Sequence, residues 1–263
     1  MENTDFLLRL LPEIEFVARS CEMLSSLRSH SGCEISFPTL MPKGDKAFSA
    51  VGLYNPRVAL SVDDEIVTND LEFDDKGRIY VLTGPNRGGK SVITCAVGLC
   101  QVMAQLGMYV PADRVELSPV DGIYTHFPTG SEDTIDKGRL GEECARLGEI
   151  FDAVTPHSLV LLDESLSSTG SYEASYIASE VLAGLSHAGC RCIFSTHLHE
   201  LAAEIDNINK RSLANGGVAI DTLVAGIMAI GGALALFTGS WIPLLLAAVV
   251  AFVVAAATKG DEI

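Results

Sequence analysis

The segment 84–91 constrains this chain more strongly than any other. It reads Gly-Pro-Asn-Arg-Gly-Gly-Lys-Ser and directly follows the apolar run 79–82. In a phosphate loop, a buried parallel strand leads into glycines whose backbone N–H groups surround phosphate oxygens, and a helix begins immediately afterwards. The stretch 92–106 has the composition of that helix, which a glycine-rich turn matching by chance would lack. The chain is therefore predicted to have an α/β fold that binds a nucleoside triphosphate.

The loop predicts a role for each of its residues. Lys90 is expected to reach the β- and γ-phosphates, and the hydroxyl of Ser91 is expected to ligate Mg²⁺. ATP and Mg²⁺ are therefore the predicted cofactors. The whole loop is the predicted nucleotide-binding segment, and its residues are Gly84, Pro85, Asn86, Arg87, Gly88, Gly89, Lys90 and Ser91.

Two later apolar runs supply candidates for catalysis. The run 158–162 ends in Asp163 and Glu164. Asp163 is expected to hold the Mg²⁺ shell and Glu164 to polarise an attacking water, which favours hydrolysis over binding alone. The run 192–194 precedes Ser-Thr-His, and His197 is a candidate sensor of the γ-phosphate.

These three elements together resemble the ATPase domain of the MutS family of DNA mismatch-repair proteins. Residues 83–91 are similar to the family's TGPNxGGKS loop, and residues 195–201 to its (A/S)THxxEL segment. Residues 161–164, followed by 169–172, are similar to the family's LxDExxxxTxxY pattern. Upstream, Tyr-Asn-Pro at 54–56 and the segment 66–70 stand where the family has stretches that border the adenine pocket. The resemblance spans about residues 16–226.

The resemblance implies a fold, an activity and partners. The fold would be a P-loop NTPase of the ATP-binding-cassette type, with a mostly parallel sheet and flanking helices. The activity would be ATP hydrolysis, and the partners would be DNA and a second copy bound through the ATPase face. In the family, a GRST segment sends a hydroxyl across the dimer, whereas residues 138–141 here read Gly-Arg-Leu-Gly. Either the backbone N–H of Gly141 replaces that hydroxyl or the contact between subunits is weaker.

The expected domains are a residual lever helix at 1–31, an ATPase domain at 32–226 and a hydrophobic tail at 227–263. Apolar residues recur at helical spacing through the first segment. The family's mismatch-reading domain has no counterpart in this sequence, so recognition of a mispaired base by this chain alone is not expected. The net charge of −16 also predicts weak duplex binding, because long-range electrostatics would repel phosphates.

The C-terminal segment differs from everything before it. No residue from Thr222 to Thr258 is charged. One helix of that length would measure about 55 Å against a hydrocarbon core of about 30 Å, so turn formers at 238–243 predict two short spans, 222–237 and 241–257. The prediction is a hydrophobic helical hairpin that anchors a cytoplasmic ATPase to the membrane. The alternative is a hairpin buried in a soluble core.

Elsewhere the pattern predicts strands alternating with helices. Helices are expected up to residue 27 and at 142–152 and 172–185, and short strands at 35–37 and 58–60. The segment 107–130 is rich in Pro and Gly and is expected to be a connection. The seven cysteines show no paired C-x-x-C spacing, which favours reduced thiols in the cytoplasm.

Two other functions compete with a mismatch-repair ATPase. One is another ATP-binding-cassette enzyme of chromosome maintenance or transport, but its Leu-Ser-Gly-Gly signature does not occur in this sequence. The other is a membrane-tethered scaffold that binds ATP and hardly turns it over. Slow hydrolysis combined with tight ATP binding would favour the scaffold.

Overall fold

A computed structural model of the chain describes residues 2–29, 32–74, 78–85, 88–127, 138–166 and 170–224. These residues fall into two compact units. Unit 1 comprises Met1–Phe73 and Cys95–Val120, and unit 2 comprises Asp74–Thr94 and the described residues within Asp121–Ile263. The division falls inside one helix, which begins in unit 2 and ends in unit 1. The domain boundaries given above stay predictions.

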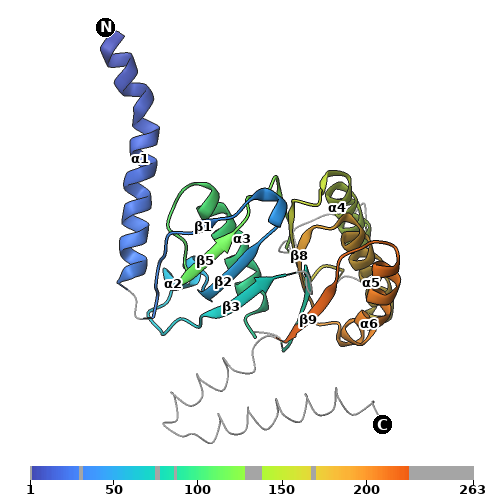
Figure 1. Ribbon diagram of the computed structural model, residues 1–263. Coiled ribbons are helices and arrows are strands. Elements are labelled where there is room, and N and C mark those ends of the chain that lie inside the picture. The colour runs from blue at the N-terminus through green and yellow to red at the C-terminus, as the bar shows by residue number, and fades with distance from the viewer. Residues whose placement is uncertain are drawn as a thin grey trace, which may run out of the picture. The chain divides into compact units, whose positions relative to one another are not determined.

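Unit 2 is built on a five-stranded parallel sheet (Figure 1). Its strands, in spatial order, are β6 (Ile123–His126), β7 (Leu159–Asp163), β8 (Arg191–Ser195), β4 (Ile79–Thr83) and β9 (Ile220–Val224). Every residue of β7 and β8 is buried. Continuous apolar runs are typical of central parallel strands, because neither face of such a strand meets water.

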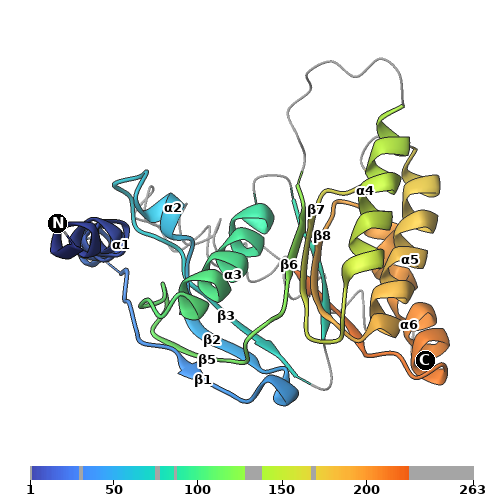
Figure 2. The ribbon, with the colours of Figure 1, turned by 90° about the horizontal axis from the view of Figure 1, so that it is seen from above.

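Three helices of unit 2 lie on one face of this sheet, as Figure 2 shows. They are α4 (Arg139–Ala153), α5 (Ser171–Ala188) and α6 (His199–Ala214). Alternate strand residues point into the core that these helices cover, and Leu162 and Phe194 are fully buried there. Side chains alternate between the two faces of a strand, so Asp163 on β7 and Ser195 on β8 face away from this helical layer.

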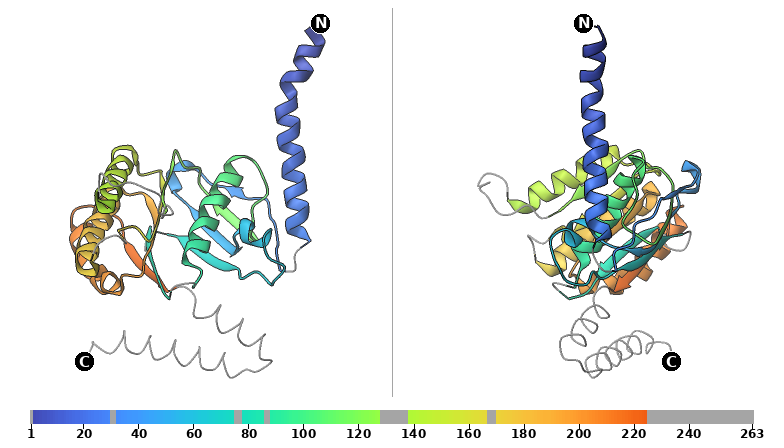
Figure 3. Two further views of the ribbon diagram at one scale, coloured as in Figure 1. Left: turned by 180° about the vertical axis from the view of Figure 1, so that it is seen from behind. Right: turned by 90° about the vertical axis from the view of Figure 1, so that its left-hand side faces the viewer.

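Unit 1 contains a second, mixed sheet. Its spatial order is β1 (Thr39–Leu40), β5 (Arg114–Leu117), β2 (Phe48–Leu53) and β3 (Asn69–Phe73). The part of α3 (Lys90–Gln105) that belongs to unit 1 lies across one face of this sheet (Figure 3). The buried amide of Gln101 donates to the carbonyl of Ser118 at 3.2 Å, which ties the helix to the end of β5.

The remaining elements of unit 1 are α1 (Glu2–Arg28), the short helix η1 (Lys43–Asp45) and α2 (Pro56–Ala59). Most described side chains of α1 are exposed, and only its last turns pack against the unit. Leu27 is fully buried there, with Tyr54 and Ile66 in the same apolar cluster. The helix predicted up to residue 27 is confirmed.

The structure corrects three predictions about local structure. The expected strand at 58–60 is wrong: Pro56–Ala59 is helical, because the Asn55 side chain accepts hydrogen bonds from the N–H groups of Arg57 and Val58 and Pro56 opens the helix. The expected strand at 35–37 is reduced to a single bridge between Ser36 and Val110. The expected connection 107–130 contains both β5 and β6.

The predicted membrane hairpin also needs correction where it can be examined. Its first span was expected to begin at Thr222, but Thr222 pairs with Val81 and Leu223 with Leu82 in the parallel sheet. Within the residues that the structure describes, no helix has both the length and the apolar character needed to cross a membrane. The tail 227–263, with the second span, lies outside the described residues.

Candidate active site

The carboxyl ends of four parallel strands are level with one another. Leu82 on β4 pairs with Ser195 on β8, and Ser195 pairs in turn with Asp163 on β7. β6 lies on the side of β7 opposite β8, and its residue His126 pairs with Leu162 of β7. Ligands of open α/β sheets bind at this edge, outside the carboxyl ends of the strands. The polar residues that end these strands are therefore candidates for one site within unit 2.

The phosphate loop follows β4 at this edge. Gly84 has a φ of 144° and Gly89 a φ of 84°, which are backbone conformations that residues other than glycine rarely adopt. The N–H of Gly88 donates to the carbonyl of Pro85 at 3.0 Å, which closes a tight turn before α3 begins at Lys90. The loop thus delivers the chain to a helix N-terminus, as the sequence predicts. Asn86 and Arg87 lie outside the described residues.

The Lys90 side chain points back into the loop. It is 4% exposed, and its Nζ donates to the carbonyls of Gly84 and Pro85, each at 3.0 Å. A buried ammonium needs such acceptors, because burial without hydrogen bonds would cost several kcal/mol. Both acceptors are neutral, so a phosphate oxygen in the loop would be a stronger partner for the same ammonium. Ser91, the next residue, is exposed.

Asp163 and Ser195 place two buried oxygen atoms next to each other on adjacent strands. Their side chains are 4% and 0% exposed, and as register partners on adjacent strands they share a face of the sheet. Among the described residues, neither Oδ1 of Asp163 nor Oγ of Ser195 has a hydrogen-bond partner. Unpaired buried oxygens are rare in native proteins, and oxygen is the ligand atom that Mg²⁺ prefers. The pair fits a metal ion or one of its waters.

A strained turn follows Asp163. Glu164 has a φ of 45° and Leu166 a φ of 67°, both in the left-handed region. Such residues cost about 1–3 kcal/mol each and persist only where the surroundings fix them. The N–H of Glu164 donates to the carbonyl of Ser195 at 2.8 Å, and Leu166 is fully buried. The Glu164 side chain is half-buried at the same edge of the sheet as Asp163.

His126 was not anticipated from the sequence. It ends β6, is 6% exposed, and its Nδ1 lies 2.7 Å from Oγ of Ser165, between the two strained residues. Burial lowers the pKa of His126 below 6.5, Arg146 lowers it further and Glu143 raises it. The imidazole is therefore neutral near pH 7. A polar residue at the end of a short strand was the only sequence signal for it.

His197 is the second residue after β8 and is exposed. The residue before it is fixed twice, since the N–H of Thr196 donates to the Leu82 carbonyl at 3.0 Å and its Oγ1 accepts from the N–H of Leu198 at 3.1 Å. This segment therefore lies beside the strand that enters the phosphate loop. The structure brings Lys90, Asp163, Glu164 and His197 to one edge of unit 2, and their roles stay predictions.

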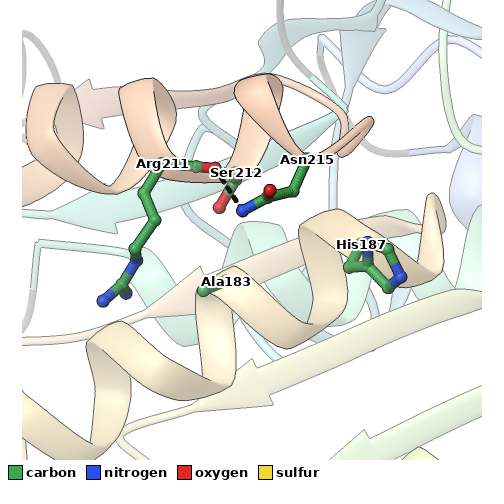
Figure 4. A pocket seen from close by; sticks show the side chains of 5 residues that line it. All are labelled: Ala183, His187, Arg211, Ser212 and Asn215. Atoms are coloured by element: carbon green, nitrogen blue, oxygen red, sulfur yellow. Dashed lines mark hydrogen bonds between the residues drawn. The ribbon is translucent and has the colours of Figure 1, made fainter.

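Two further features lie away from this edge of the sheet. The segment 54–56, expected at an adenine pocket, belongs to unit 1, where Tyr54 is buried and Asn55 caps α2. A hollow of about 510 Å³ is lined by residues of α5 and α6 and by the residue after α6 (Figure 4): Ala183, His187, Arg211, Ser212 and Asn215. Both helices end at this hollow. The hydroxyl of Ser186 in α5 donates to the carbonyl of Val218 at 2.6 Å, which places the end of α5 near the start of β9. The hollow is thus at the opposite edge of the sheet from the phosphate loop.

A parallel sheet with a glycine loop after one strand and a buried acid at the end of another defines the P-loop-like class of α/β folds. Residues 80–229 match the family model of MutS domain V. The chain is 37% identical over 163 residues to the DNA mismatch repair protein MutS of Roseiflexus sp. (strain RS-1), a match that covers 60% of this chain and 15% of that protein. It is 34% identical over 201 residues to the protein of the same name from Prochlorococcus marinus (strain MIT 9301), covering 72% of this chain and 22% of that protein.

A third relative, the DNA mismatch repair protein MutS of Thermosipho melanesiensis, is 35% identical over 174 residues, which is 62% of this chain and 21% of that protein. The family model alone covers more than half of the chain. The chain therefore belongs to the MutS family, and the resemblance read from its motifs is confirmed. It spans less than a quarter of the length of these relatives.

The lowered pKa of His126 predicts a loss of stability in acid. The folded state binds fewer protons than the unfolded state below pH 6.5, so the stabilisation is complete well above 6.5 and is lost as the pH falls through 6.5 toward the folded pKa. Urea unfolding from about pH 8 to about pH 5 should show a steeper decline for the parent than for His126→Asn. Parallel declines would contradict the assignment of a neutral, buried His126.

Proposed function

We propose that unit 2 binds ATP with Mg²⁺ and hydrolyses it as the nucleotide-processing part of a mismatch-repair protein. The observation that carries this proposal is the buried Oδ1 of Asp163, which has no hydrogen-bond partner among the described residues and lies at the sheet edge that also bears the phosphate loop. A carboxylate oxygen that is buried without a hydrogen bond is costly unless a cation coordinates it or a water donates to it. Membership of the MutS family supports the same chemistry.

Different residues of this chain bind the phosphates, bind the metal ion and activate the water. Backbone N–H groups of the loop and Lys90 hold the phosphates, and Ser91 and Asp163 hold Mg²⁺, which neutralises charge on the phosphates when bound. Glu164 orients and polarises the attacking water. His197, exposed after β8, contacts the γ-phosphate. Each step uses a group that is already at the carboxyl edge of the sheet.

DNA and a second copy of the chain are the proposed partners. The relatives carry the name DNA mismatch repair protein, and the proposal extends that role to this chain. A net charge of −16 implies that the chain alone binds duplexes weakly. Because no segment of this sequence is similar to the family's mismatch-reading domain, we expect no preference for a mismatch. Competition between a G·T heteroduplex and its matched homoduplex tests this, and a clear preference for the heteroduplex would refute it.

A second candidate is a nucleotide-dependent scaffold with little turnover. One observation favours it: the N–H of Gly141, the group available to replace the missing hydroxyl, donates to the carbonyl of Gly138 at 2.7 Å. That N–H is used within the first turn of α4, so the contact expected from the resemblance between two subunits is weakened. Without that contact the chain would hold ATP and hydrolyse it slowly.

Lys90→Ala should weaken ATP binding by about 10- to 100-fold, because it removes a charge-assisted hydrogen bond of about 1.5–3 kcal/mol. Titration of a fluorescent ATP analogue with Mg²⁺ measures the loss, and circular dichroism confirms that the variant is folded. Lys210→Ala, at an exposed position of α6, is the matched control and should bind like the parent. If Lys90→Ala kept the parent's affinity, the loop would not be the nucleotide site.

Glu164→Gln should retain ATP binding while turnover falls by about 100- to 10,000-fold, because the general base is lost and the metal ligands remain. Phosphate release under saturating ATP gives turnover, and equilibrium binding gives affinity. Glu149→Gln, exposed on α4, controls for loss of a carboxylate elsewhere. Unchanged turnover would remove Glu164 from the mechanism. A parent that binds ATP tightly with negligible turnover would instead favour the scaffold.

A further inference from the structure

The turn after β7 is held at three successive residues. The backbone N–H of Glu164 bonds the carbonyl that ends β8, the Ser165 side chain bonds His126, and the Leu166 side chain is fully buried. The two outer residues have left-handed backbones, and the middle one makes the only side-chain hydrogen bond in the described part of this turn. A turn with two such residues relaxes unless its anchors hold it.

His126 reaches this turn from a different strand. It is the last residue of β6 and is the register partner of Leu162, so its side chain is on the face of the sheet that α4, α5 and α6 cover. Asp163 is on the other face. The imidazole therefore stands behind the turn, away from the metal ligands, and contacts Ser165 through Nδ1 at 2.7 Å.

We propose that His126 is a positioning residue, which acts through Ser165 to hold the left-handed backbone of Glu164 and so to fix where its carboxylate meets water. The inference rests on the proposed ATPase function, because Glu164 is the water-polarising group there. It assigns to β6, the edge strand, a part in catalysis that neither the phosphate loop nor the acidic motif contains.

The surroundings of His126 support a hydrogen-bonding role. Arg146 and Glu143, the charged residues of α4 that act on it, have opposite effects on its pKa, and burial keeps the ring neutral near pH 7. A neutral ring adds no positive charge next to the residue that follows Glu164. Ser165 is 3% exposed, so water does not replace the imidazole as the partner of its hydroxyl without opening the turn.

The geometry allows a test that distinguishes this role from simple filling of space. An Asn side chain places a polar atom where Nδ1 of His lies, whereas a Gln side chain places it near Nε2. In the full chain, His126→Leu and His126→Gln should lower turnover by about 10- to 100-fold while the affinity for ATP stays within about twofold, since a small misplacement of a reacting group has that effect. His126→Asn should restore most of the turnover.

The partner residue completes the test. Ser165→Ala should lower turnover as His126→Leu does, and the double variant should be no slower than either single variant, because both remove one interaction. His187→Leu, on the last turn of α5, controls for loss of a histidine and should turn over ATP like the parent. Additive losses, equal activity of the Asn and Gln variants, or a parallel loss of ATP affinity would overturn the proposal.

A second measurement does not depend on turnover. The N–H of Glu164 bonds Ser195, so its amide hydrogen exchange reports the turn directly. Exchange should accelerate at least about tenfold in His126→Leu and His126→Gln and stay near the parent rate in His126→Asn. Unchanged exchange in His126→Leu would overturn the positioning role. If the parent binds ATP but shows no turnover, the proposed hydrolysis fails, and the exchange pattern still decides whether His126 holds the turn.

Discussion

The register of three parallel strands is the constraint on which the site depends. Leu82, Ser195 and Asp163 are paired across β4, β8 and β7, so the phosphate loop, the turn after Asp163 and the segment before His197 all leave the sheet at one level. A shift of one residue in β7 would turn Asp163 toward the helical core, and the same shift in β8 would turn Ser195 there, with core residues moved to the opposite face in each case. The buried apolar side chains on the other parity of each strand, such as Leu162 and Phe194, prevent that shift.

The turn after Asp163 contains two strained residues, Glu164 and Leu166. Approximate energies indicate which interactions offset that strain. Two non-glycine residues in left-handed conformations cost about 2–6 kcal/mol together. Full burial of Leu166 contributes about 1.5–3 kcal/mol, and each neutral hydrogen bond about 1 kcal/mol. Burial of Leu166 alone does not offset the upper part of that strain. The hydrogen bonds from Glu164 to Ser195 and from Ser165 to His126 are therefore comparable in size to the remaining deficit.

Most of the parallel sheet could be predicted, because each central strand is a short apolar run with a motif at its end. The strands at 79–82 and 192–194 and the helices at 142–152 and 172–185 are confirmed within a few residues. Prediction failed where a local signal competed with the apolar pattern. Val58 stands in an apolar stretch, but the Asn55 cap and Pro56 start a helix there. In 107–130, the Pro and Gly content predicted a connection without strands. The segment nevertheless contains β5 and β6, which pair with strands distant in the sequence.

The same limit explains which site residues the sequence revealed. Lys90 and Asp163 belong to contiguous motifs that indicate their chemistry from sequence alone. His126 and Ser165 are 39 positions apart and meet only because β6 pairs with β7. The first turn of α4 shows a related point. The absence of a hydroxyl at 138–141 was visible in the sequence, but only the structure shows that the N–H of Gly141 already has an acceptor in Gly138. Because a backbone N–H cannot serve two acceptors at full strength, the first turn of α4 would have to open before the N–H of Gly141 could bond a second acceptor.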